Sequence, residues 1–200
     1  MRKIGAIILA AGGSARFGRP KQLLPFQGVT LILRAVRAAT SARCNPVIVV
    51  TGQGELEIAR QLKESAALIV PNPDWRNGIA SSIRCGVERV AEFNVSGGVL
   101  LTCDQPLVDC EAIRGLISLA DRTHKPIAAA EYCDTLGIPA LFARKFFPEL
   151  LLLRGASGAK RIILANLDKV VRYTLPEAAI DIDTEADAAE LKLEATDGES

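Results

Sequence analysis

A glycine-containing turn with a cluster of cations follows the first apolar run of the sequence. The run Ile4–Ala10 continues into Ala11-Gly12-Gly13, and basic side chains then stand at Arg16, Arg19 and Lys21. Small residues let a ligand approach the backbone closely, and successive backbone N–H groups then point at phosphate oxygens. The residue types and their order therefore predict a loop that binds a phosphorylated ligand.

This turn differs from the two commonest phosphate-binding motifs. Gly13 and Gly18 have the spacing of a P-loop, but Arg19-Pro20 stands where that motif has its lysine and its magnesium-binding hydroxyl. No three glycines have the Gly-x-Gly-x-x-Gly spacing of a dinucleotide fingerprint. The alternative is a plain strand-to-helix turn with solvated cations, and the combination of apolar run, glycines and cations favours phosphate binding over it.

A carboxylate, Asp104, comes directly after a second buried-strand pattern, Gly98–Cys103. The carboxyl ends of parallel strands meet at one edge of a sheet, so Asp104 should face the same edge as the glycine turn. A carboxylate oxygen there suits Mg²⁺, which usually takes one or two protein carboxylates together with substrate phosphates. The alternative is an aspartate that only caps a turn or a helix, and the residue alone does not decide.

A second carboxylate stands near the C-terminus in the run Asp181-Ile182-Asp183-Thr184. Asp183 would supply a second metal ligand if Thr184 caps the helix that follows. The alternative is that Asp183 is only part of a helix start, and the residue types taken alone favour that alternative.

Two further loops combine small, polar and charged residues. The loop of residues 72–82 contains the sole tryptophan, Trp75, and either binds a base or sugar or is a surface loop that Trp75 anchors by packing. Residues 154–161 place three cations and two glycines before a predicted helix, which indicates either an anion site for an acceptor phosphate or a helix–helix turn. His124, the single histidine, lies in a predicted loop, and we expect it to be a surface residue rather than a general base.

Apolar runs and helical patterns alternate along the chain, which predicts a mostly parallel sheet covered by helices on both faces. We expect one domain over residues 1–194 and a flexible tail over 195–200. The predicted strands are residues 4–10, 46–51, 67–70, 98–103, 126–130, 140–143 and 170–173, and the predicted helices are 31–42, 56–62, 79–90, 109–119, 146–153, 159–167 and a last one ending near 193.

Composition excludes several classes of protein. The 200 residues include 24 basic and 23 acidic ones, so we expect no nucleic-acid partner. No apolar run approaches the roughly 18 residues of a membrane span, and we interpret the apolar run after Arg2-Lys3 as a strand rather than a secretion signal. The five cysteines are widely spaced without a Cys-x-x-Cys pair, which predicts small buried residues and a cytoplasmic protein.

Several motifs together resemble one family. The run Leu9-Ala10-Ala11-Gly12-x-Ser14-x-Arg16-x-Gly18-x-x-Lys21 resembles the signature of the MobA-like nucleotidyltransferases. Four further motifs resemble the molybdenum cofactor cytidylyltransferase branch of that family. They are Asn72-Pro73-x-Trp75-x-x-Gly78-Ile79-x-x-Ser82, Asp104-Gln105-Pro106, Gly137-Ile138-Pro139 and Asp181-Ile182-Asp183-Thr184-Glu185-Ala186-Asp187.

The resemblance implies a three-layer Rossmann-like sandwich of the nucleotide-diphospho-sugar transferase type. It implies transfer of CMP from CTP to the terminal phosphate of molybdopterin with release of pyrophosphate, with Mg²⁺ as cofactor and a molybdoenzyme or its accessory protein as a further partner. The implied roles are backbone contacts to base and triphosphate by Leu9, Ala10, Ala11, Gly12 and Gly13, catalysis by Arg16, Lys21 and Asp104, metal binding by Asp104 and Asp183, and proximity to the nucleoside for Asn72 and Ser81.

Two positions depart from the family pattern. Ala156 stands where relatives usually have an aspartate, and Ile138 stands where they often have a polar residue. Both positions belong to the part expected to hold the acceptor. Two alternatives therefore stay open, a nucleotidyltransferase for another phosphorylated acceptor such as a sugar phosphate and a nucleotide-binding accessory protein without turnover.

Overall fold

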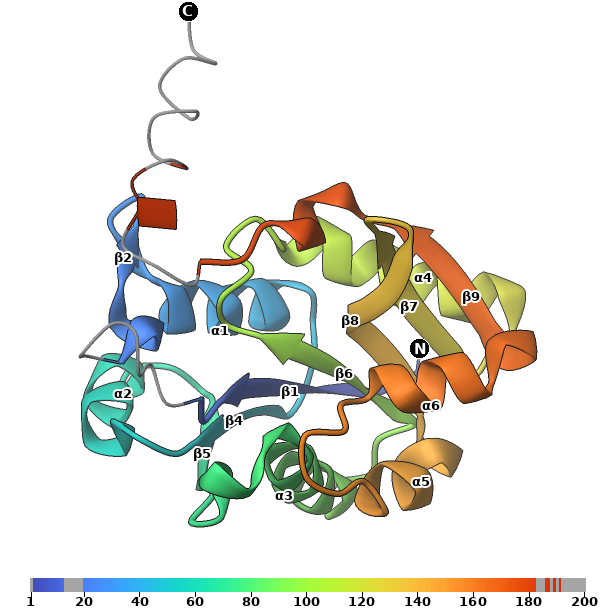
Figure 1. Ribbon diagram of the computed structural model, residues 1–200, viewed down its shortest axis with the longest axis horizontal. Helices are drawn as coiled ribbons and strands as arrows, with labels where there is room; N and C mark the ends of the chain where they lie inside the picture. The colour runs from blue at the N-terminus through green and yellow to red at the C-terminus, as the bar shows by residue number, and fades with distance from the viewer. Residues whose placement is uncertain (1, 13–19, 183–185, 188, 190, 192–200) are drawn as a thin grey trace, which may run out of the picture.

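The computed structural model describes residues 2–12, 20–182, 186–187, 189 and 191. Its centre is a seven-stranded sheet in the order β5-β4-β1-β6-β8-β7-β9 (Figure 1). The strands are β1 (Ile4–Ala10), β4 (Val47–Thr51), β5 (Leu68–Pro71), β6 (Gly97–Thr102), β7 (Ile127–Tyr132), β8 (Thr135–Ala143) and β9 (Val170–Thr174).

Helices cover both faces of the sheet, which confirms the predicted three-layer sandwich (Figure 1). One face packs against α1 (Leu31–Ser41), α2 (Glu55–Leu62) and α4 (Cys110–Thr123), and the other against α3 (Ile79–Ala91), α5 (Phe147–Leu151) and α6 (Lys160–Ala165). Neighbouring side chains of β1 alternate between the faces, with Ile7 in one buried cluster and Ile8 in the other. Every residue of β1 is therefore buried, as in a central strand with both faces covered.

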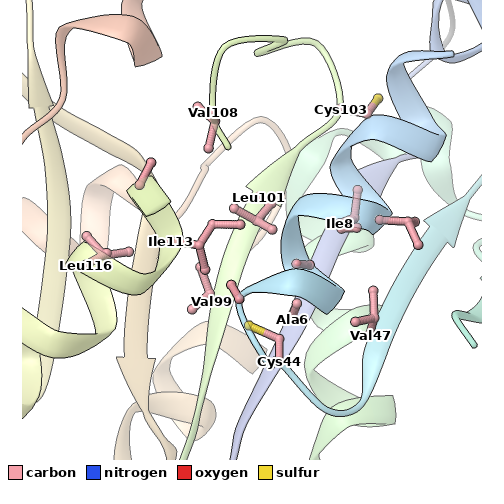
Figure 2. Close-up of a cluster of buried hydrophobic side chains, with 14 of the residues drawn as sticks. Ala6, Ile8, Cys44, Val47, Val99, Leu101, Cys103, Val108, Ile113 and Leu116 are labelled. Atoms are coloured by element: carbon pink, nitrogen blue, oxygen red, sulfur yellow. The ribbon is translucent and has the colours of Figure 1, made fainter. Parts of the chain in front are cut away.

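The buried cluster that contains Ile8 lies between the sheet and helices α1 and α4. Figure 2 shows Ile8 of β1 and Leu101 of β6 beside Ile113 and Leu116 of α4. All four side chains are at most 3% exposed. This cluster holds β1 and β6 side by side, and the two segments that follow these strands are the ones expected to carry the chemistry.

Strand β8 is the main departure from a parallel sheet, because it pairs antiparallel with both β6 and β7. The strand predicted at residues 140–143 is only its second half. The first half contains Gly137 and Pro139, two residues that are depleted in strands and hide the pattern. Cys133 and Asp134 turn the chain between β7 and β8 with positive φ angles of 47° and 55°.

Several loops converge at one edge of the sheet. Strands β1, β4, β5 and β6 pair in parallel, so all four end at the same edge. The chain then passes through two short elements at this edge, the 3-10 helix η1 (Lys21–Leu23) after β1 and the 3-10 helix η2 (Trp75–Asn77) after β5. This edge is where the sequence predicts ligand binding.

The N- and C-terminal parts of the described chain meet through a small apolar cluster. It contains Leu24, Phe26 and Leu31 from the region of the hairpin β2 (Pro25–Phe26) and β3 (Val29–Thr30), which the sequence analysis does not predict, together with Ile182 and Leu191. Ala186, Asp187, Ala189 and Leu191 are helical, in agreement with the predicted last helix. The rest of that helix and the predicted tail lie outside the described residues.

The cysteines correct one expectation. Cys44 and Cys103 are buried as predicted, but Cys85 and Cys110 are only half-buried and Cys133 is exposed, because it lies at the tip of the β7–β8 hairpin. All five thiols are free. In the described part of the chain, no helix combines the length and the apolar composition that crossing a membrane requires.

Candidate functional site

A cavity of about 440 Å³ opens at the edge where β1, β5 and β6 end. This volume is in the usual range for a site that binds a small organic ligand. Three stretches form its walls: Leu9, Ala11, Gly12, Lys21 and Gln22 after β1, Trp75, Arg76, Gly78, Ile79 and Ser82 after β5, and Thr102, Cys103 and Asp104 at the end of β6. Three of the segments that the sequence singles out, the turn after β1, the loop after β5 and the segment with Asp104, therefore surround one cavity.

Lys21 and Asp104, which both line the cavity, form an ion pair. Lys21 Nζ lies 2.6 Å from Asp104 Oδ2, and the two side chains are 17% and 22% exposed. Lys21 comes from η1 and Asp104 from the end of β6, so the pair joins the loop after β1 to the centre of the sheet. Both side chains are within reach of a ligand in the cavity.

Gln22 holds the backbone of the loop after β1. Its side chain is 1% exposed, and Nε2 donates to the carbonyl oxygens of Ala10 at 2.8 Å and Gly12 at 2.9 Å. No sequence pattern indicates a role for Gln22, because its partners are backbone atoms that any residue type would provide.

Asn72 in the loop after β5 and Ser81 in the first turn of α3 are buried, and they are not among the residues that line the cavity. Asn72 Nδ2 donates to the hydroxyl oxygens of Ser81 at 2.9 Å and Ser82 at 3.0 Å, and its Oδ1 accepts from the N–H of Asp74. Ser81 Oγ is also within hydrogen-bonding distance of the Gly78 carbonyl. These bonds shape the loop, and direct contact of Asn72 or Ser81 with a nucleoside stays a prediction.

Trp75 packs as an anchor and also lines the cavity. Its ring is partly buried against the α3 face of the core, and a Cβ placed on Gly52 would lie 2.7 Å from Trp75 Cγ. The Arg76 guanidinium lies 4.7 Å above the Trp75 ring, in a cation–π arrangement at the cavity wall. The two alternatives drawn from the sequence are thus compatible.

The loop of residues 154–158 packs against Gly78 at the end of the loop after β5. Gly78 has a φ of +98°, and a Cβ placed there would lie 2.4 Å from the Gly155 carbonyl oxygen. That oxygen accepts a hydrogen bond from the Ala80 N–H at 3.2 Å. The segment for which the sequence leaves an anion site and a helix–helix turn open is therefore part of the structure that supports the cavity, and anion binding there stays a prediction.

Backbone and amide hydrogen bonds place the segment 178–182 beside Asp104. The Ile182 N–H donates to the Asp104 carbonyl oxygen at 2.8 Å, and Gln105 Nε2 donates to the carbonyl oxygens of Ala178 at 2.7 Å and Ile138 at 3.1 Å. The predicted second metal ligand, Asp183, follows directly, but it lies outside the described residues, as do Gly13 and Arg16.

The described residues suit a divalent cation that is held jointly by one protein carboxylate and the phosphates of a bound ligand. They contain no cluster of three or more His, Cys, Asp or Glu side chains able to hold a metal ion. Asp104 is the carboxylate in the described cavity wall. One carboxylate together with ligand phosphates is a usual environment for Mg²⁺ and similar hard cations, and a zinc-like site is not indicated.

Burial keeps two ionisable groups near the site protonated. Desolvation, and then the nearby Asp104 charge, raise the pKa of the Cys103 thiol well above its ordinary value. Desolvation, followed by the charge of Asp181, likewise raises the pKa of the Tyr132 phenol. Cys103 is thus a neutral part of the cavity wall at physiological pH and not an activated nucleophile.

Comparison with known proteins agrees with this arrangement. A family model described as the MobA-like NTP transferase domain matches residues 6–170. Purine catabolism protein PucB from Bacillus subtilis (strain 168) is 28% identical over 165 residues, which cover 78% of each chain. Molybdenum cofactor cytidylyltransferase from Escherichia coli (strain K12) is 26% identical over 189 residues, 94% of each chain.

A solved structure extends the comparison to three dimensions. Rv0371c from Mycobacterium tuberculosis H37Rv, in complex with manganese, has a TM-score of 0.76 and 26% sequence identity to this chain, over 94% of this chain and 97% of that one. The family model spans most of the sequence and includes the loops after β1, β5 and β6. The chain is therefore a nucleotidyltransferase of the MobA-like NTP transferase family.

Proposed function

We propose that this protein transfers CMP from CTP to the terminal phosphate of molybdopterin. The observation that carries the proposal is the Lys21–Asp104 ion pair in the wall of a cavity that Ala11 and Gly12 also line. The pair presents one cation and one anion at the place where a triphosphate and its metal would bind. The likeness to a molybdenum cofactor cytidylyltransferase over 94% of each chain supports the choice of donor and acceptor.

The reaction needs no nucleophile from the protein. An oxygen of the acceptor phosphate attacks the α-phosphorus of the nucleotide, the bond from that phosphorus to the bridging oxygen breaks, and pyrophosphate leaves with the electron pair. The acceptor phosphate is already anionic at neutral pH, so the main obstacle is to bring two anions together. Positioning and charge stabilisation by the protein lower this barrier.

We assign the residues of the cavity accordingly. The backbone of Leu9–Gly12 would contact the base and the triphosphate, and Lys21 would move from Asp104 to the phosphates. Asp104 would then hold the divalent cation, which supplies neutralisation of phosphate charge when bound. We propose Mg²⁺ for this role, and the manganese complex of Rv0371c supports a divalent cation in this family. Gly13, Arg16 and Asp183 keep the roles predicted from the sequence.

Pyrophosphate release tests the proposed reaction. The protein is mixed with each of the four ribonucleoside triphosphates and Mg²⁺, with molybdopterin, with a sugar 1-phosphate or with no acceptor. We expect rapid release only with molybdopterin, and fastest with CTP. The product would then pass to a molybdoenzyme or its accessory protein. Nucleotide binding without release for any acceptor would instead identify a binding protein without turnover.

A second candidate is transfer to a sugar phosphate. It is favoured by Ala156, whose backbone N is 3.0 Å from a Cβ placed on the cavity-lining Gly78. The loop that lacks the family's usual aspartate is thus close to where an acceptor would approach. Release with the sugar phosphate and not with molybdopterin would select this candidate.

A further inference from the structure

Gln22 joins the loop after β1 to the turn that carries Lys21. Its side-chain amide has two N–H hydrogens, and the two carbonyl oxygens of Ala10 and Gly12 accept both at 2.8 and 2.9 Å. The glutamine follows Lys21 directly within η1. One buried side chain therefore ties the backbone of the loop after β1 to the turn that carries the Lys21 cation.

The orientation of the amide is determined by its partners. Both partners are carbonyl oxygens, so the reverse orientation would place Oε1 against two acceptors and is excluded. In the observed orientation Oε1 is buried and has no hydrogen-bond partner among the described residues. The unpaired buried oxygen offsets part of the stabilisation that the two bonds provide. The glutamine is therefore better explained by what the two bonds hold in place, which is the backbone of the loop after β1.

From these contacts we propose that Gln22 is a positioning residue that sets the shape of the nucleotide loop. Because a trans peptide directs its C=O and its N–H to opposite sides, binding the Ala10 carbonyl turns the N–H of Ala11 away from Gln22. The amide also compensates the negative ends of two carbonyl dipoles that would otherwise repel an anionic ligand. The inference rests on the proposed function only in taking a nucleoside triphosphate as the ligand.

Two substitutions separate this role from a role in stability. Gln22→Met keeps the length of the side chain but removes both donors and the unpaired oxygen. The Ala10 and Gly12 carbonyl oxygens then lose these bonds, so we expect a folded protein with a moderately lower melting temperature and roughly tenfold or more weaker binding of CTP. Gln22→Glu replaces the donors by a carboxylate that faces two carbonyl oxygens. Its affinity for CTP should be lower still at pH 8 and should partly recover at pH 5, where a protonated carboxyl donates one bond.

The matched control is Gln61, an exposed glutamine on α2 outside the cavity. Gln61→Met and Gln61→Glu should bind CTP like the wild type at both pH values. Binding is measured by calorimetry with CTP and Mg²⁺ in the absence of acceptor, and folding by thermal unfolding of the same samples.

The outcomes are distinct. Folded Gln22→Met that binds CTP as tightly as the wild type would overturn the inference while leaving the proposed function intact. Loss of folding in both Gln22 variants would also overturn it, because Gln22 would then belong to the stability of the chain. Failure of the wild type to bind any nucleoside triphosphate would contradict the proposed function instead.

Discussion

The Lys21–Asp104 ion pair places two opposite charges where the proposed reaction needs both. Each side chain is about one-fifth exposed and both residues line the cavity, so a ligand can reach both charges. A triphosphate offers new negative charge to Lys21, and a divalent cation offers new positive charge to Asp104. Binding of nucleotide and metal would thus exchange one set of opposite charges for another, without leaving a charge unpaired.

Removal of the Lys21 cation should impair catalysis. We expect Lys21→Ala to lower kcat/KM for CTP about a hundredfold or more, because the ammonium faces charge that develops on the phosphates. Pyrophosphate release measures the effect. The control is Lys63→Ala, which removes an exposed lysine at the end of α2 and should leave the rate unchanged. A wild-type rate for Lys21→Ala would exclude Lys21 from the mechanism.

Asp104→Asn should uncouple activity from divalent cations. The amide keeps the shape of the side chain but removes the charge that attracts the metal, so the rate should fall and its dependence on Mg²⁺ or Mn²⁺ concentration should weaken strongly. Titration of the activity with either cation measures this. Asp121→Asn, on the surface of α4, serves as control. An Asp104→Asn enzyme that titrates like the wild type would show that another residue holds the metal.

At the scale of elements, the cavity depends on how closely two loops approach each other. The backbone at Gly78 has φ +98° and ψ 171°, a conformation that is essentially restricted to glycine, and it lies against the Gly155 carbonyl. This contact sets the position of Ile79 and the start of α3. The loop of residues 154–158 thereby supports the cavity wall that Gly78 and Ile79 form, although it is some 75 residues away in sequence.

Gly78→Ala should therefore disturb both stability and binding. We expect a loss of roughly 1–3 kcal/mol in the free energy of unfolding from backbone strain, and weaker CTP binding because the two loops must separate. Urea unfolding and calorimetry measure the two effects. Gly28→Ala is the matched control, since Gly28 also has a positive φ, of +77°, but open space around its Cβ position. Equal effects of both variants on CTP binding would refute the role of the loop contact.

Much of this arrangement can be predicted from the sequence. The apolar run Ile4–Ala10 predicts a central strand, and the carboxyl-edge rule brings Gly12, Lys21 and Asp104 to one place, because both depend on local patterns and parallel pairing. The first half of β8 is missed since Gly137 and Pro139 mask it.

Contacts between distant backbone segments could not be predicted. Gln22 acts through the carbonyl oxygens of Ala10 and Gly12, and Gly78 acts through its approach to Gly155. Both depend on how the chain folds back on itself, and a polar residue or a glycine in a loop has no pattern that shows its partner. Asn72 and Ser81 are found by motif, but their bonds to each other emerge only in three dimensions.

At the scale of the whole molecule, the site joins distant parts of one chain. The loop after β1 comes from the N-terminal part of the sequence, and Ile182, which binds the Asp104 carbonyl, comes from the C-terminal part. Ile182 also packs with Phe26 and Leu31 in the small apolar cluster. Movement of the segment around Ile182 would therefore affect Asp104 through this backbone hydrogen bond.

The buried thiol of Cys44 should make the fold sensitive to alkaline pH. Burial raises the pKa of Cys44 from 9.0 to about 12, so between these values the unfolded chain loses this proton and the folded chain keeps it. The contribution of Cys44 to the free energy of unfolding is constant below pH 9 and then falls by up to about 1.4 kcal/mol per pH unit. Urea unfolding from pH 7 to 11 measures the slope. Cys44→Ala should reduce it, Cys133→Ala should not, and an unchanged slope in Cys44→Ala would contradict the assignment.

The most direct test of the central claim is a crystal structure of the protein with CTP and Mn²⁺. We expect the triphosphate between the Leu9–Gly12 loop and Lys21, the Lys21–Asp104 ion pair separated, and the anomalous signal of manganese beside the Asp104 carboxylate. A nucleotide bound away from this cavity, or manganese far from Asp104 with the ion pair intact, would contradict the account.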